Sequence, residues 1–99
     1  MKVLSLPVTF LEYQAIKSDA QSMVQKRLNL NWTGKLVSVQ TQKFKVFNVV
    51  KITAFDESSL YYELDGITIG LGSRALGTSS RKVYYNIHLG VETGAPEED

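Results

Sequence analysis

The sequence predicts a single α+β domain in which one N-terminal helix packs on a curved antiparallel sheet of five or six strands, as a sandwich or a partly open barrel. Two patterns support this prediction. Apolar residues recur with the spacing of an amphipathic helix in residues 9–28, whereas they alternate with polar residues, as in half-buried strands, in the flanking segments. A chain of 99 residues is long enough for one hydrophobic core and too short for two.

The first residues predict a strand followed directly by the helix. Residues 2–8 alternate, and Pro7 places their strand at a sheet edge because proline cannot donate a ladder hydrogen bond. Thr9 precedes Glu12 with the spacing of a capping box, which begins a helix. We expect this helix to extend to Leu28 and to end in the polar residues that follow.

The residues after the helix predict a turn and a second strand. A lone tryptophan usually covers the core where helix and sheet meet, and we expect this of Trp32, with stacking on a ligand as the alternative. Val37 and Val39 alternate with polar residues, so residues 35–41 are expected to form a strand.

The longest apolar run, residues 43–56, predicts one long strand of the core. It is rich in Phe, Val and Ile and contains no Gly or Pro. Asn48 interrupts the alternation, and we expect the strand to bend or bulge there. A hairpin at Asn48 is the alternative, although no neighbouring Gly supplies the positive φ angles that such a turn prefers. The side chains expected to face the core are Phe44, Val46, Val50, Ile52 and Ala54.

The last third of the chain predicts a hairpin, a loop and a final strand. Asp65-Gly66 joins residues 60–64 to residues 67–71, and both turn residues tolerate the positive φ of a two-residue hairpin. Residues 70–80 lack a core pattern and are expected to form a mobile surface loop. Residues 82–91 alternate strictly, with Val83, Tyr85, Ile87, Leu89 and Val91 expected to face the core.

The composition limits the chemistry of the protein. The chain has no Cys, which excludes disulfides, thiolate metal sites and cysteine nucleophiles. His88 is the only histidine, and no carboxylate or nucleophile stands at a spacing that would make it a catalytic base. We therefore expect no enzymatic activity, no cofactor and no bound metal. Neither a run of roughly 20 apolar residues nor a signal peptide is evident, so we expect a cytoplasmic protein without membrane contact.

Charge is distributed unevenly along the chain. The 11 basic and 10 acidic residues give a net charge of +1. Four of the acidic residues lie after residue 91, so residues 1–91 carry a net charge of +5. We expect one globular domain over residues 1–91 and a disordered acidic tail over residues 92–99, which has no large apolar side chain to bury.

These observations predict a small binding or assembly module. The leading hypothesis is a protein partner, which includes a second copy of the chain, bound through the sheet surface and the mobile loop at residues 70–80. The alternative is single-stranded nucleic acid, held by lysines and arginines and stacked on Tyr61 and Tyr84, with the acidic tail regulating binding. The candidate partner-binding residues are Lys43, Lys45, Lys51, Tyr61, Arg74, Arg81, Lys82 and Tyr84.

Overall fold

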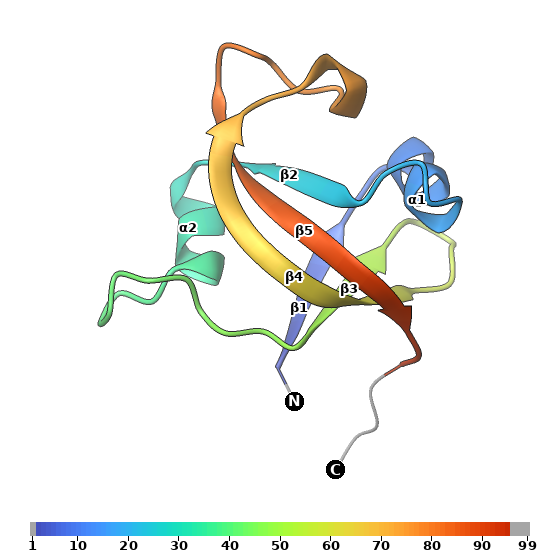
Figure 1. Cartoon of the computed structure of the whole chain (residues 1–99), viewed down its shortest axis with the longest axis horizontal. Coiled ribbons are helices and arrows are strands. Elements are labelled where there is room, and N and C mark those ends of the chain that lie inside the picture. The colour runs from blue at the N-terminus through green and yellow to red at the C-terminus, as the bar shows by residue number, and fades with distance from the viewer. Residues whose placement is uncertain (1, 96–99) are drawn as a thin grey trace.

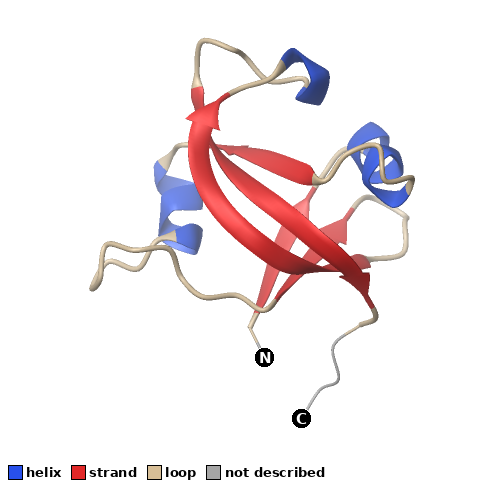
Figure 2. Ribbon diagram, viewed as in Figure 1, coloured by secondary structure: helices blue, strands red, loops and turns tan. Residues whose placement is uncertain are grey.

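The computed structural model describes residues 2–95, in which two α-helices, one short 3-10 helix and five strands are present (Figures 1 and 2). The α+β class is confirmed, with one helix more than expected. No helix in this part of the chain is long and apolar enough to cross a membrane. The elements are β1 (Val3–Pro7), α1 (Phe10–Lys17), β2 (Met23–Arg27), α2 (Leu30–Leu36), β3 (Val49–Thr53), β4 (Leu60–Leu71), η1 (Arg74–Leu76) and β5 (Val83–Thr93).

The strands form one mixed sheet in the order β1-β3-β4-β5-β2. β1 pairs parallel with β3, and the other neighbours are antiparallel. The expectation of a purely antiparallel sheet is wrong, because the long connection through α1, β2 and α2 brings the chain back beside β1 in the same direction. β4 and β5 bend strongly, yet the sheet does not close, since β1 and β2 remain its edges (Figure 1). Lys26 Nζ of β2 donates one hydrogen bond to the Pro7 carbonyl oxygen of β1.

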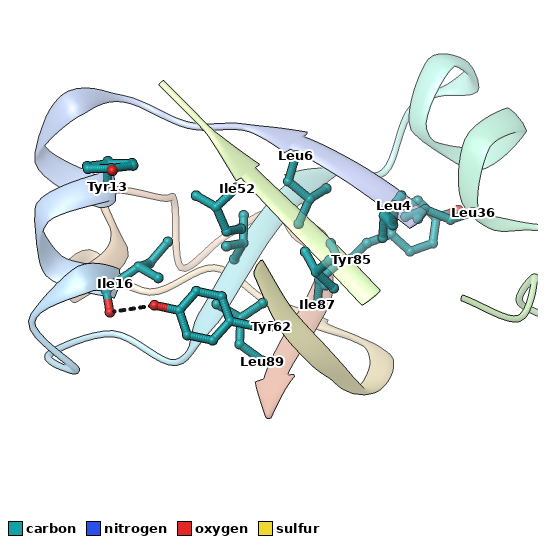
Figure 3. Packing of buried hydrophobic residues seen from close by; sticks show 12 residues of the cluster. Leu4, Leu6, Tyr13, Ile16, Leu36, Ile52, Tyr62, Tyr85, Ile87 and Leu89 are labelled. Carbon is teal, nitrogen blue, oxygen red and sulfur yellow. Dashed lines mark hydrogen bonds between the residues drawn. The ribbon is translucent and has the colours of Figure 1, made fainter. Parts of the chain in front are cut away.

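The hydrophobic core lies between the inner face of the sheet and both helices (Figure 3). The predicted alternation of the last strand is confirmed for Tyr85, Ile87 and Leu89, which are buried. Val83 and Val91 are exposed, because the ends of β5 extend beyond the core. The buried cluster consists of Leu4, Leu6, Tyr13, Ile16, Val24, Leu36, Val50, Ile52, Tyr62, Tyr85, Ile87 and Leu89.

The first helix begins as predicted but is much shorter. Thr9 Oγ1 accepts a hydrogen bond from the Glu12 N–H at 3.2 Å, which confirms the N-cap. The helix ends at Lys17 rather than at Leu28. Asp19 adopts a left-handed φ of 63°, a conformation that ends a helix and turns the chain.

β2 and α2 occupy the region that was expected to complete this helix. Val24 of β2 is buried opposite Ile87 of β5, so a long-range strand pairing overrides the helical spacing of the apolar residues. Asn29 begins α2, because its Oδ1 accepts a hydrogen bond from the Trp32 N–H at 2.9 Å. Trp32 packs against the core, as expected.

Two of the predicted strands are mostly loop. Residues 35–41 contain the end of α2 and one residue of an isolated β-bridge. The long strand expected at residues 43–56 is reduced to β3, and Val46, expected in the core, is exposed. Asn48 does interrupt the segment: its Oδ1 accepts a hydrogen bond from the Lys2 N–H at 3.1 Å, and its own N–H donates to the Lys2 carbonyl oxygen at 2.9 Å. These bonds tie the chain to the start of β1 just before β3 begins.

Asp65-Gly66 is not a hairpin turn. β4 runs through both residues, and its register against β5 shifts there, as at a β-bulge. Gly66 does not have a positive φ, so the turn geometry that its sequence favours is not used. Gly90 on β5 leaves room for the bulge, since a Cβ there would lie 3.2 Å from the Glu63 carbonyl oxygen. The hairpin connection lies instead at residues 72–82, after a single long strand.

Two predicted boundaries also shift. Residues 70 and 71, which were assigned both to the strand at residues 67–71 and to the start of the loop, end β4. Glu92 and Thr93, the first two residues of the predicted tail, belong to β5. Residues 96–99 of that tail lie outside the described residues.

Candidate functional site

Basic and acidic residues occupy different segments of the chain. Residues 20–55 contain six basic residues and no acidic one. Residues 66–91 contain three further basic residues and again no acidic one. The basic residues of these two segments are Lys26, Arg27, Lys35, Lys43, Lys45, Lys51, Arg74, Arg81 and Lys82.

The fold keeps part of this separation in space, although Glu12 acts on Lys26 and shares a cleft with Arg74. Glu12 lies in α1, and Asp56 and Glu57 lie in the β3–β4 turn. This turn is held against α1 by a 2.6 Å hydrogen bond from the Tyr13 hydroxyl to the Ser58 carbonyl oxygen. In Figure 1, α1 and this turn lie on the right, whereas α2 and the loop that follows it lie on the left. The elements that carry these three carboxylates thus lie across the molecule from α2 and its loop.

An open cleft of about 270 Å³ lies at the end of β2, beside the start of β5. Arg27 and Lys82 bring two positive charges to its wall, and its lining includes no carboxylate. Two larger open clefts, of about 460 and 530 Å³, include Glu63 and Glu12 respectively. Of these three clefts, the smallest therefore favours an anion most. Its lining consists of Arg27, Leu28, Asn29, Lys82, Val83 and Tyr84.

A polar network under the 72–82 connection holds that connection on the outer face of the sheet. Gln25 of β2 is only 8% exposed, and its Nε2 donates to Asn86 Oδ1 at 2.7 Å and to the Leu71 carbonyl oxygen at 3.1 Å. Its Oε1 accepts a hydrogen bond from the Thr78 hydroxyl, which in turn accepts one from the Ser73 N–H at 2.7 Å. Because buried polar groups are costly to leave unpaired, this network anchors the connection to β2 and β5.

Tyr84 borders the cleft, but its ring is buried. It is 6% exposed, and its hydroxyl accepts a hydrogen bond from the Ser79 N–H at 3.2 Å. Gly72 lies against the ring, since a Cβ at this position would come within 2.6 Å of Tyr84 Cε2. The expectation that Tyr84 stacks on a base is therefore wrong: the ring instead supports the connection that carries Lys82.

Trp32 is an aromatic residue in the first turn of α2. It is half-buried, and two ammonium groups lie close to its ring. Lys35 Nζ is 4.7 Å and Lys26 Nζ is 5.2 Å from the ring centroid, which is within the range of cation–π attraction. Burial lowers the pKa of Lys26; the charge of Glu12 partly opposes this effect, and the charge of Lys35 adds to it.

The predicted residues of the sheet surface are only partly brought together. Lys51 and Tyr61 are direct cross-strand neighbours of β3 and β4, as the outward-face hypothesis requires. Lys43 and Lys45 do not join them, because they lie in the loop before β3. Lys45 Nζ instead donates a 2.9 Å hydrogen bond to the Gly34 carbonyl oxygen of α2.

The remaining predicted residues lie on the β4–β5 connection. Arg74, Arg81 and Lys82 are exposed there, and Lys82 is the one that reaches the cleft. Sequence reasoning missed Arg27 and Lys26, because both fell inside the helix that was expected to extend to Leu28. The absence of any acidic residue over residues 20–55 was the signal that could have identified this region.

His88, the only histidine of the chain, is not part of the cleft lining. His88 Nε2 lies 2.8 Å from Thr68 Oγ1 on the outer face of the sheet. No three His, Asp or Glu side chains among the residues described come together as a metal site requires. No family model, no curated protein and no solved structure matches this chain.

Proposed function

We propose that this protein is a non-enzymatic binding module for single-stranded nucleic acid, which it holds by its phosphates on the basic side of the sheet. The observation that carries the proposal is the segregation of charge. Arg27 and Lys82 line a cleft without a carboxylate, and Lys26 and Lys35 lie around the adjacent helix α2. Surfaces of one charge sign raise the local concentration of oppositely charged ligands.

The residue types suit a nucleic-acid strand. A guanidinium such as that of Arg27 binds phosphate oxygens in a bidentate manner, and the ammonium of Lys82 adds a point charge. Leu28 and Val83 place apolar surface beside both cations, where a sugar or base edge can pack. Trp32 favours a single strand over a duplex, because unpaired bases are free to stack on aromatic rings.

Fluorescence anisotropy with a labelled single-stranded oligothymidylate tests the proposal. We expect binding at about 50 mM salt, with an affinity that falls steeply as salt increases, because each phosphate contact releases condensed counterions. The double variant Arg27→Gln/Lys82→Gln should reduce the slope of log affinity against log salt by about 0.7 for each phosphate contact removed. The matched control is Lys2→Gln/Lys17→Gln, which removes the same charge from exposed lysines away from the cleft.

Two outcomes would contradict this function. One is that the unmodified protein does not bind the oligonucleotide at about 50 mM salt, where electrostatic attraction is strong. The other is that the two double variants weaken binding equally, because the effect would then reflect net charge and not the cleft.

A protein partner, including a second copy of the chain, is the second candidate. Ile69, Leu71 and Val83 remain 56%, 63% and 43% exposed at the end of the β4–β5 hairpin, and Leu71 and Val83 are cross-strand partners. Exposed apolar side chains that adjoin one another are typical of interaction surfaces. Sedimentation velocity should then show self-association that Leu71→Gln abolishes and Leu11→Gln, a change at another exposed leucine on α1, leaves intact. A monomer at all concentrations would exclude the second copy as the partner.

A further inference from the structure

Trp32 is held in a fixed position between the core and two lysines. It lies in the first turn of α2, and Asn29 Oδ1 fixes its backbone N–H. One part of the indole packs on the core, and the residue remains partly accessible. Because the ring is already held in place, its side chain loses little entropy when a ligand stacks on it.

The two lysines differ in how firmly they are held. Lys26 lies on β2, is partly buried, and donates a hydrogen bond to the Pro7 carbonyl oxygen. Lys35 is exposed and follows Trp32 by three residues on α2, so the two side chains share one face of the helix. Lys35 can therefore move away from the ring without any change in the backbone, whereas Lys26 is part of the contact between the two sheet edges.

Two ammonium groups beside one indole repel each other. Residues 20–55 contain no carboxylate, and Glu12 of α1 is the acidic residue whose charge offsets part of this repulsion at Lys26. The pKa of Lys26 is lowered mainly by burial; the charge of Glu12 opposes this effect, and the charge of Lys35 adds to it with the sign expected of such repulsion. A phosphate group placed at the edge of the ring would attract both ammonium groups at once.

We propose that Trp32 is a base-stacking platform and that Lys26 and Lys35 bind the phosphate next to the stacked base. This inference rests on the proposed function and specifies it: the ligand is recognised through its bases as well as through its backbone. Lys35 covers the ring in the free protein and turns to the phosphate when a base takes its place. Arg27 follows Lys26 on the edge strand β2 and faces the other side of the sheet, so a strand that occupies both the platform and the cleft passes around this edge.

The competing explanation is structural. Cation–π contacts also stabilise folds, and here Lys26 bonds to Pro7 of β1 while Trp32 packs against the core. Under that explanation Trp32 would affect binding only through stability. Replacing Trp32 would then weaken the binding of a strand with bases and of an abasic strand to the same extent.

The experiment compares two labelled strands of equal length, oligothymidylate and a fully abasic phosphodiester. Trp32 is the only tryptophan of the chain, so its emission reports on this site alone. We expect both strands to bind, and only oligothymidylate to quench the emission strongly. Trp32→Leu should lower the affinity for oligothymidylate about tenfold or more and leave that for the abasic strand unchanged. Lys35→Gln should make the salt dependence of both strands shallower by about 0.7.

The outcomes separate this inference from the function on which it rests. If neither strand binds, both are wrong. If both strands bind but the emission of Trp32 does not change, the platform is wrong and the phosphate-binding function stands. Equal losses for the two strands in Trp32→Leu would also overturn the platform. Circular dichroism checks the folding of that variant, and Lys35→Gln, a surface change, keeps the test valid if Trp32→Leu does not fold.

Discussion

Replacing Gly72 by Ala should destabilise the protein by about 1–3 kcal/mol, the usual cost of inserting a methyl group into a well-packed site. An added Cβ would lie 2.2 Å from the Ser79 carbonyl oxygen and 2.6 Å from Tyr84 Cε2, where ordinary contacts begin at 3.4 Å. Gly72 does not have a positive φ, so backbone strain adds nothing to this cost. The Ser79 backbone would have to retreat by more than an ångström, which would lift the 72–82 connection from Tyr84.

Urea unfolding followed by circular dichroism and by Trp32 emission measures this loss. In thermal unfolding, each kcal/mol corresponds to roughly 4–8 °C for a domain of this size. Gly34→Ala is the matched control: nothing lies within 4 Å of its added Cβ, and Ala favours the helix α2 by about 1 kcal/mol. The two variants should thus shift stability in opposite directions. Unchanged stability of Gly72→Ala, or a similar shift in both variants, would show that the connection does not pack on Tyr84 as described.

Three further predictions follow from the core, a buried phenol and the chain end. Ile52→Ala should cost about 2–5 kcal/mol in urea unfolding because Ile52 is fully buried in β3, whereas Val91→Ala at an exposed position should change stability by less than about 0.5 kcal/mol. Burial, and then the charge of Glu92, raises the pKa of Tyr62 to about 12. The unfolded chain releases this proton near pH 10, so stability should fall from about pH 10 to pH 12, and Tyr62→Phe should flatten that fall. Removing residues 96–99 takes away three acidic residues and should tighten oligonucleotide binding at low salt; unchanged anisotropy curves would exclude competition by the chain end.

Local signals in the sequence predicted the features that depend on neighbouring residues. The Thr9 cap requires only the N–H of Glu12, and it is present. The alternation of β5 was correctly interpreted for Tyr85, Ile87 and Leu89, where one face of the strand covers the core, and not for the strand ends. Asn48 does mark a break in the apolar run, although β3 begins only after it and the continuous bent strand that was predicted there does not form.

The errors occur where a distant partner decides between two locally allowed structures. Met23 and Val24 fit a helix or a strand, and pairing with β5 selects the strand. Asp65-Gly66 fits a hairpin or a bulge. The bulge is selected because it lets a single long strand pair with β5 on both sides, including Ile67 with Ile87. In both cases the pairing with β5 cannot be recognised from the residues that are close in the sequence.

The candidate site depends on the same long-range strand pairing that the local pattern did not reveal. Because residues 23–27 form a strand and not a helix, Arg27 lies opposite Tyr84 of β5 and close to Lys82 in one cleft. A helix through Leu28 would have placed Arg27 on a solvated surface without such a neighbour. The cationic residues could be identified from the sequence, whereas their assembly required the sheet order.

The register of β2 also links the core to the site. In the observed register Val24 faces the core, so Gln25 and Arg27 face outward, toward the 72–82 connection and the cleft. A slip by one residue would reverse every side chain of the strand, placing Gln25 and Arg27 in the core and Val24 in water. The burial of Val24 therefore excludes that alternative, and the same pairing energy that stabilises the core holds Arg27 beside Lys82. The basic cleft thus depends on rigid strand pairing at the edge of the sheet, which holds its charges at fixed positions, as the proposed binding of a phosphate backbone requires.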